Sequence, residues 1–204
     1  MTDRSVAQEA KRRQLLDAAV RVFARKGFHT ARVGDVAEEA GVSHGLLYHY
    51  FESKDELLQA IFVATWTELL ESLAAVEDSG EPAREQLRQV AAILLRSWRR
   101  QPDVVRVIVQ EIGRGGELGS RSADLRAVVD SIERIIRRGQ ESGELRAGLD
   151  ARLAATIFYG GIDEFLTSWV FGLVPDGDDA VAAAERTLLD VVCGGLAVGA
   201  GAPA

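Results

Sequence analysis

Residues 41–51, GVSHGLLYHYF, concentrate ring side chains that can form hydrogen bonds at a protein surface. They hold two of the three histidines in a chain whose formal net charge is -7. An imidazole can donate or accept a hydrogen bond, and a tyrosine ring can contact a methyl group while its hydroxyl bonds a phosphate. The major groove of B-DNA is about 12 Å wide, admits one helix and presents such partners on its base edges. We therefore expect His44, Gly45 and Tyr48 to face DNA, the glycine by letting the backbone approach closely.

Two local signals predict how this short helix is held against the helix before it. Gly41 follows VGDVAEEA and can take the left-handed conformation that turns the chain between two helices. Ser43 is a favourable N-cap for the next helix. Val42 and Leu47 would fill the space between the two helices. The pattern is that of a helix-turn-helix.

Packing is the competing explanation for the aromatic residues. It is the favoured interpretation for Phe51, and it stays open for Tyr50. For His44 and Tyr48 the groove interpretation is favoured, because the glycine turn, the serine cap and the basic first helix all agree with it.

Positive charge is concentrated at the amino-terminal end of the chain. Residues 1–34 contain eight Lys or Arg against three Asp or Glu, although the whole chain is acidic. A basic end on an acidic body indicates that this end meets a polyanion while the rest keeps the protein in solution. A solvated basic arm is the alternative that composition alone leaves open.

Apolar residues recur every three or four positions along most of the chain, which is the period of an α-helix. We expect an all-α fold of nine helices, with a trihelical domain at residues 1–52 and a helical bundle at residues 53–200. Ser53 and Glu56 form the pattern of a capping box at the start of the first long helix of the bundle. The glycine-rich stretch 113–120 is expected to be a loop.

Patterns of catalytic and metal-binding residues are missing from the sequence. There is no Ser–His–Asp set or glycine-rich phosphate loop, and every histidine falls within the first 54 positions. Cys193 is the only cysteine, so there is neither an internal disulfide nor a cysteine-based zinc site. We therefore expect that the protein is not an enzyme and that it binds neither a cofactor nor a metal ion. Asp163 and Glu164 are the sole candidates for a buried acid, and a ligand anchor or dimer contact is favoured for them.

Targeting signals are also missing. Residues 1–13 lack the apolar segment of a signal peptide, and no apolar run approaches the roughly 20 residues that span a bilayer. We expect a cytoplasmic protein that does not enter a membrane.

The larger half contains two features that a plain helical bundle does not require. Gly160–Gly161 interrupts a strongly apolar helix, at a cost of about 1 kcal/mol per glycine relative to alanine. A close helix crossing or space for a ligand would account for it. Six arginines gather around the two loops on either side of the short apolar stretch 104–112: Arg96, Arg99, Arg100, Arg106, Arg114 and Arg121. A solvated face is the default interpretation of these arginines, and a site for a phosphorylated ligand is the alternative.

The residues from Leu15 to Leu58 resemble the DNA-binding domain of the TetR family of one-component transcriptional regulators. The resemblance is strongest in AGVS and LYHYFESKDEL and implies a homodimer that places two trihelical heads in successive major grooves of a palindromic operator. It implies base contacts from His44, Gly45 and Tyr48, and we include the N-cap Ser43 beside them in the DNA-binding surface. It implies phosphate contacts from His49, Tyr50 and Lys54.

The sequence departs from the family pattern at the start of the second helix. The family usually has Thr followed by Ser or Thr before the valine, whereas this chain has Ala31–Arg32. We therefore assign the phosphate contact to Arg32 because of its charge. Gly34 stands where many relatives carry a side chain that reads a base, and we include it in the DNA-binding surface.

Residues 109–170 resemble a narrower group, the acyl-CoA-responsive repressors of fatty-acid degradation within the TetR family. The resemblance implies a long acyl chain in a tunnel between helices, with the nucleotide phosphates beside arginines at its mouth. The residues that it implies for the acyl chain are Trp98, Ile108, Ile112, Ile136, Phe158, Phe165 and Trp169, and those for the phosphates are Arg106, Arg114 and Arg121.

The last two expected helices, residues 152–173 and 180–198, are apolar and rich in Ala and Gly, so two copies can pack as a four-helix bundle. The sequence thus predicts a dimeric DNA-binding repressor that a long-chain acyl-CoA releases. The alternative is a TetR-family regulator of efflux or another pathway that responds to a different hydrophobic molecule.

Overall fold

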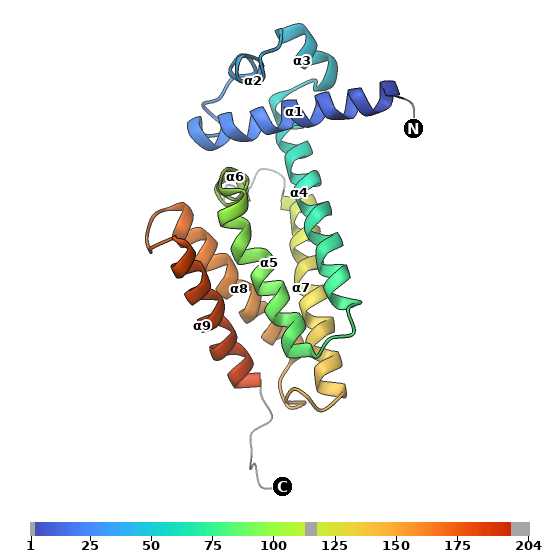
Figure 1. Cartoon of the computed structure of the whole chain (residues 1–204), viewed down its shortest axis with the longest axis vertical. Helices are drawn as coiled ribbons and strands as arrows, with labels where there is room; N and C mark the ends of the chain where they lie inside the picture. Colours follow the sequence, from blue (N-terminus) through green and yellow to red (C-terminus); the bar gives the residue numbers. More distant parts are fainter. Residues whose placement is uncertain (1–2, 113–117, 197–204) are drawn as a thin grey trace. The chain divides into compact units, whose positions relative to one another are not determined.

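The chain is helical throughout the part that the structure describes, which confirms the predicted all-α class. The computed structural model describes the backbone of residues 3–112 and 118–196, and the side chains of 5–111 and 123–196. Nine helices lie in these ranges (Figure 1). They are α1 (Asp3–Lys26), α2 (Val33–Ala40), α3 (His44–Tyr50), α4 (Lys54–Glu77), α5 (Ala83–Arg100), α6 (Pro102–Ile112), α7 (Leu118–Glu141), α8 (Ala151–Val170) and α9 (Asp178–Leu196).

The described residues form two compact units. One lies within Met1–Thr67 and Asp103–Arg114, and the other within Glu68–Pro102 and Gly115–Ala204. The first unit therefore holds the start of α4 and nearly all of α6 together with α1–α3. The expected functional boundary after residue 52 stays a prediction.

Helices α1, α2 and α3 of the first unit pack around a small apolar core (Figure 1). Leu15, Ala19 and Val22 recur on one face of α1, and all three are completely buried. Val36 and Ala37 of α2 are equally buried, because small side chains let the two helices approach closely. This core is what fixes α2, and α2 in turn supports α3.

The second unit is built from α5, α7, α8 and α9 together with the end of α4. Residues such as Leu87, Leu95 and Ile132 are completely buried between these helices. The two adjacent glycines of α8 have different surroundings. A methyl group built on Gly161 would lie 2.7 Å from a Leu188 methyl of α9, whereas one on Gly160 would meet nothing within 4 Å. Gly161 therefore marks a close helix crossing, one of the two explanations that we expected.

Helix α4 begins as the capping-box pattern predicts. The backbone N–H of Glu56 donates to the Ser53 hydroxyl at 3.1 Å, and the Glu56 carboxylate accepts from the N–H of Glu52, one residue earlier than the usual box. By length and hydropathy α4 could cross a membrane, which we did not expect from the sequence. Its Leu57, Ile61 and Leu73 are buried in the protein, as in a core helix.

Residues 113–120 were predicted to be a loop, but α7 already begins at Leu118, so the last three of these residues are helical. Residues 113–117 lie outside the described part of the chain.

Candidate DNA-binding surface and effector site

The turn between α2 and α3 has the predicted geometry. Gly41 takes a left-handed conformation at φ 66°, and its N–H donates to carbonyl oxygens of Ala37 and Glu38 at the end of α2. The Ser43 hydroxyl then accepts from the N–H of Leu46 at 3.2 Å, which caps α3. Both interactions are local, so residues 37–46 themselves set the angle at which α3 leaves α2.

The residues of α3 divide between a buried and an exposed face. Leu47 is completely buried, and Phe51 at the helix end is 2% exposed, which confirms its packing role. Arg12 of α1 lies over the Phe51 ring at 5.2 Å. The residues that face solvent are His44, Gly45, Tyr48 and His49.

Tyr48 and Tyr50 occupy different environments on this helix. Tyr48 is 52% exposed, so its ring is accessible to a partner. Tyr50 is half-buried, and its ring meets the His49 ring edge to face at 5.5 Å. A polar aromatic surface at the end of a capped helix can offer hydrogen bonds and apolar contact together.

The start of α2 is capped from within the helix. Arg32 is the N-cap, and its N–H donates to the Asp35 carboxylate at 2.8 Å. A hydrogen bond from Lys26, and then this N–H, hold the pKa of the Asp35 carboxyl below its ordinary value. The Arg32 side chain is exposed at this helix end, so it is accessible to a phosphate.

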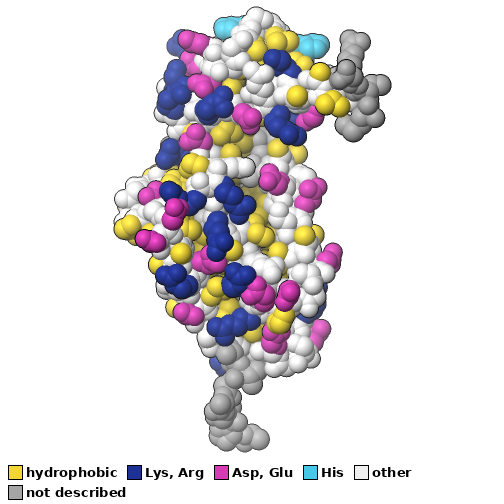
Figure 2. Space-filling view, in the orientation of Figure 1, with side chains coloured by type: hydrophobic (Ala, Val, Ile, Leu, Met, Phe, Trp, Pro, Cys, Tyr) yellow, Lys and Arg dark blue, Asp and Glu magenta, His cyan; other side chains and the backbone are white. Residues whose placement is uncertain are grey.

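Several cations of the basic amino-terminal end have partners within the first unit. Arg21 and Arg25 bond the two oxygens of Glu39 at 2.8 and 3.0 Å, and they hold the pKa of that carboxyl below its ordinary value. Lys26 bonds Asp35 at 2.8 Å. On the face shown in Figure 2, basic side chains are interspersed with acidic ones. The basic excess counted in the sequence is thus only partly available to an external anion.

Lys54 binds the connection between α1 and α2. Its ammonium group donates to the carbonyl oxygens of Phe28, His29 and Ala31 at 2.7, 3.3 and 3.1 Å. It also lies 4.5 Å from the centre of the Phe28 ring. These contacts use the three N–H donors of the side chain. The expected phosphate contact of Lys54 stays a prediction that requires the ammonium group to share or leave these bonds.

The same connection receives a second contact from farther along the chain. The imidazole Nε2 of His29 lies 3.6 Å from a carboxylate oxygen of Glu111 on α6. Glu111 is 5% exposed, so this carboxylate is held at the end of a largely apolar helix. Sequence reasoning missed both contacts, since no local pattern links residues 28–31 with positions 54 and 111.

Most residues predicted to line an acyl chain are core residues of the second unit. Ile136 and Phe158 are completely buried, and Trp98 and Trp169 nearly so. The Trp98 indole donates to Asp176 at 3.2 Å, and the Trp169 indole donates to the carbonyl oxygen of Pro175 at 3.0 Å. Half-buried Phe165 stacks on Trp169 with ring centres 5.9 Å apart.

The remaining predicted effector residues lie elsewhere. Arg106 and half-buried Ile108 are on α6 in the first unit, where Arg106 approaches Asp103 at 3.8 Å. Ile112, Arg114 and Arg121 lie outside the described side chains. We did not predict a role for Trp66 of α4, whose indole N–H is buried and has no hydrogen-bond acceptor among the described residues. A buried donor of this kind is rare and calls for a ligand or a water molecule.

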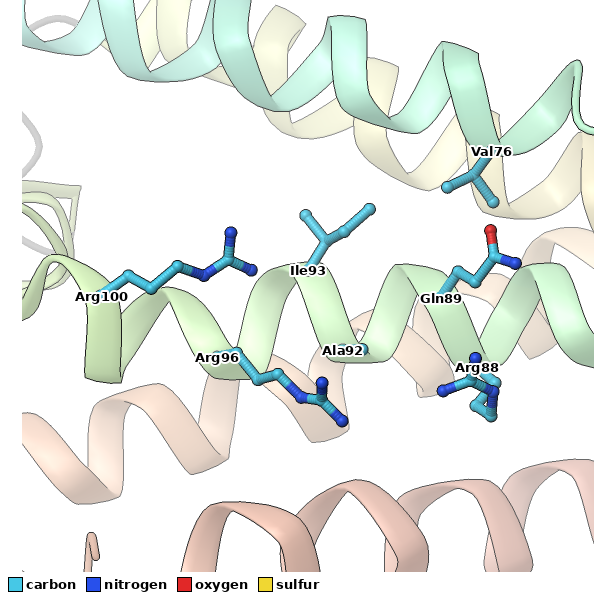
Figure 3. A pocket seen from close by; sticks show the side chains of 7 residues that line it. All are labelled: Val76, Arg88, Gln89, Ala92, Ile93, Arg96 and Arg100. Carbon is cyan, nitrogen blue, oxygen red and sulfur yellow. The ribbon is translucent and has the colours of Figure 1, made fainter. Parts of the chain in front are cut away.

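An open groove of about 290 Å³ runs along the outer face of α5. Figure 3 shows Val76 of α4 approaching it from one side, while Gln89, Ile93 and Arg100 of α5 project toward that side. The other lining residues are Arg88, Ala92 and Arg96. None of the residues predicted for the effector lines this groove.

Two of the three arginines in the groove are already neutralised. Arg96 makes a bidentate contact with Glu185 of α9, a residue that is 6% exposed. Arg88 bonds the two oxygens of Glu85 at 2.8 and 2.5 Å and lies 3.7 Å from Glu185. Outside the groove, Arg99 pairs with Asp178 at 2.7 Å. The solvated-face interpretation therefore fits Arg96 and Arg99 better than a phosphate site does.

Two family models match most of the chain. The model described as "Bacterial regulatory proteins, tetR family" covers residues 15–61, and "Tetracyclin repressor-like, C-terminal domain" covers residues 84–192. The chain is 29% identical to the fatty acid metabolism regulator protein of Bacillus subtilis (strain 168) over 185 residues, which are 90% of this chain and 94% of that protein. It is 31% identical to the transcriptional regulator TtgR of Pseudomonas putida, over 88% of each chain.

Solved structures of similar proteins agree with these matches. The Bacillus subtilis regulator FadR in complex with stearoyl-CoA superposes with a TM-score of 0.78 at 29% identity, covering 90% of this chain and 98% of that one. The fatty acid degradation regulator FadR of Bacillus halodurans gives 0.77 at 26% identity, covering 88% and 94%. The chain therefore belongs to the TetR family, whose members are DNA-binding transcriptional regulators and not enzymes.

Proposed function

We propose that this chain binds a palindromic DNA operator in the cytoplasm as a homodimer and represses transcription until a long-chain acyl-CoA releases it. The observation that carries the DNA-binding part is the division of α3 into two faces. Leu47 anchors one face in the core, while His44 and Tyr48 stand exposed on the other. A rigidly capped helix with an exposed polar aromatic face suits insertion into a major groove.

A homodimer would account for the exposed apolar side chains of the last two helices. Leu153 and Ile157 of α8 are 63% and 67% exposed, and Val191 of α9 is 70% exposed. Methyl groups built on Gly160 or Gly194 would meet nothing within 4 Å, so partner helices could approach these positions closely. Two copies joined here would form a four-helix bundle and present two α3 helices roughly 34–36 Å apart.

Two observations support an acyl-CoA effector: the similarity of this chain to a relative that binds one, and a buried hydrogen-bond donor, the Trp66 indole N–H, that has no acceptor among the described residues. The Bacillus subtilis relative binds stearoyl-CoA and resembles this chain over 90% of its length. The buried Trp66 indole N–H can donate to a carbonyl oxygen, such as that of a thioester.

Two helices offer a route from the effector to the DNA-binding head. Helix α4 contributes to both compact units, and its first residue, Lys54, bonds the connection after α1. Helix α6 meets the same connection through Glu111 and His29. An effector that shifts either helix would therefore move the support of α2 and α3. Ligand and operator would then weaken each other's binding by the same factor.

A hydrophobic effector without CoA is the second candidate, and the α5 groove favours it. Arg96 is paired with Glu185 and Arg88 with Glu85, so two of the three arginines in the groove already have a carboxylate partner. In this alternative the chain would regulate efflux or another pathway.

A titration separates these candidates. A duplex selected by the protein from a randomised pool is bound at half saturation, and palmitoyl-CoA, palmitate or CoA is then added. We expect palmitoyl-CoA to lower duplex affinity by about 5–150-fold and palmitate to have a much smaller effect. Equal release by palmitate would favour the second candidate. Unchanged affinity with all three would remove the effector proposal and leave the DNA-binding proposal intact.

A further inference from the structure

Gly34 and His44 meet at the exposed end of the head, although they belong to different helices. A methyl group built on Gly34 of α2 would lie 3.0 Å from Cε1 and 3.1 Å from Nε2 of the His44 ring of α3. These distances are shorter than an ordinary contact between such atoms, which is about 3.5–4.0 Å. The far end of the imidazole therefore occupies the space that a side chain at position 34 would need.

We propose that Gly34 is a positioning residue for His44: by having no side chain, it lets the imidazole lie across the start of α2, and so sets which atoms of the ring face DNA. The inference rests on the proposed DNA-binding role of α3 and gives Gly34 a role different from direct contact with a base. A base edge distinguishes donors from acceptors, so the orientation of the ring decides which base is preferred.

The helix backbone at Gly34 is fixed, so a clash there must be relieved by the imidazole. The nearby N-cap residue Arg32 is held by Asp35, and the following residues Val36 and Ala37 are completely buried. His44 is exposed, so its ring can shift toward solvent. A methyl group at position 34 would therefore displace the ring by a few tenths of an ångström without disturbing the fold.

Gly45, the next residue of α3, shows that this contact is specific. A methyl group built on Gly45 would meet nothing within 4 Å. Of these two glycines, only Gly34 lies so close to the His44 ring that an added methyl group would press against it.

A double-mutant cycle tests the inference, with a duplex that the wild-type protein selects from a randomised pool. We expect Gly34→Ala to weaken binding of this duplex about tenfold and to change the preferred base at one symmetric pair of positions. In a His44→Ala background, the same substitution should change affinity by less than about twofold. The thermal midpoint should not fall, because alanine is a better helix former than glycine.

Two results would overturn the inference. One is an unchanged affinity and base preference in Gly34→Ala. The other is an equal loss in the His44→Ala background, which would mean that the Gly34 backbone itself approaches DNA.

A measurement without DNA separates this inference from the proposed function. In the free protein, a nuclear Overhauser effect should connect the His44 Hε1 proton with the Gly34 Hα protons, and the chemical shifts of the His44 ring should change in Gly34→Ala as the ring is displaced. Absence of this effect in the wild-type protein would contradict the positioning role even if DNA binding is confirmed. Failure to select any duplex while the effect is present would instead contradict the DNA-binding proposal.

Discussion

The polar surfaces of α3 and α5 differ in how their side chains are paired. On α3, His44 and Tyr48 stand exposed beside a fully buried Leu47. On α5, Arg96 is held by both oxygens of Glu185. Polar groups without internal partners are available to an external one, whereas an arginine already paired with a carboxylate attracts an external anion less strongly. The comparison teaches that a basic groove need not be a binding site, and that an exposed aromatic face with few charges can be one.

The largest expected effect lies in the second unit. Phe158→Ala should lower the free energy of unfolding by about 3–5 kcal/mol, because the ring is completely buried and its removal leaves a cavity. Chemical denaturation measures this loss. If the ring instead lines a ligand tunnel, the loss will be small without palmitoyl-CoA, and the effector response will change.

Dimer formation should be the next most sensitive property. Ile157→Glu would place a carboxylate in the proposed interface between α8 helices, where two copies bring like charges together. We expect the dimer dissociation constant to rise by at least about tenfold, as measured by sedimentation. Val63→Glu, at a residue that is 54% exposed on α4, provides a matched control on a helix outside the proposed interface. An undiminished dimer would place the interface elsewhere.

Tyr48→Ala tests the exposed face of α3. It should reduce discrimination between operator and random duplex by about 1–3 kcal/mol and leave the unfolding transition unchanged, because the ring is 52% exposed. Tyr48→Phe retains the ring and removes only the hydroxyl, so it shows which group matters. Full discrimination in the alanine variant would mean that α3 enters DNA on another face.

Lys54→Ala separates two roles of one residue. We expect the free energy of unfolding to fall by about 1–3 kcal/mol, because three carbonyl groups lose a charged donor. If Lys54 contacts a phosphate instead, as the family resemblance implies, stability will hold and the salt dependence of duplex binding will weaken by about one unit. Lys11→Ala is a matched control, since the Lys11 ammonium bonds Gln14 on the same helix.

The smallest effect concerns the orphan indole of Trp66. Trp66→Phe keeps an aromatic ring and removes the buried N–H, so it should raise the free energy of unfolding by up to about 1 kcal/mol. The same change should weaken the response to palmitoyl-CoA, because the ligand loses a donor. A loss of both stability and response would show that Trp66 acts only by packing.

The sequence could predict the α2–α3 region because its determinants are local. Gly41 turns the chain and Ser43 caps α3 within six residues, so the pattern itself contains the interaction partners. The order of the nine described helices followed from apolar periodicity in the same way. By contrast, the partners of Lys54 lie at least 23 residues away along the chain, and Glu185 lies 89 residues from Arg96. Only the packed fold reveals such pairs.

The prediction of the effector-binding residues was the least specific part of the sequence analysis. Apolar periodicity identified Phe158 and Ile136 as inward-facing, which the structure confirms, but core and tunnel residues share that pattern. The contact between Gly34 and His44 was also inaccessible, because it depends on the angle between two helices.

Selection of duplexes from a randomised pool by the purified protein tests the central claim most directly. The account predicts a palindromic sequence whose half-sites are centred about 10–10.5 base pairs apart, and its loss when His44→Ala and Tyr48→Ala are combined. A pool without a preferred sequence, or the same preference in the double variant, would contradict the assignment of α3 as the DNA-reading helix.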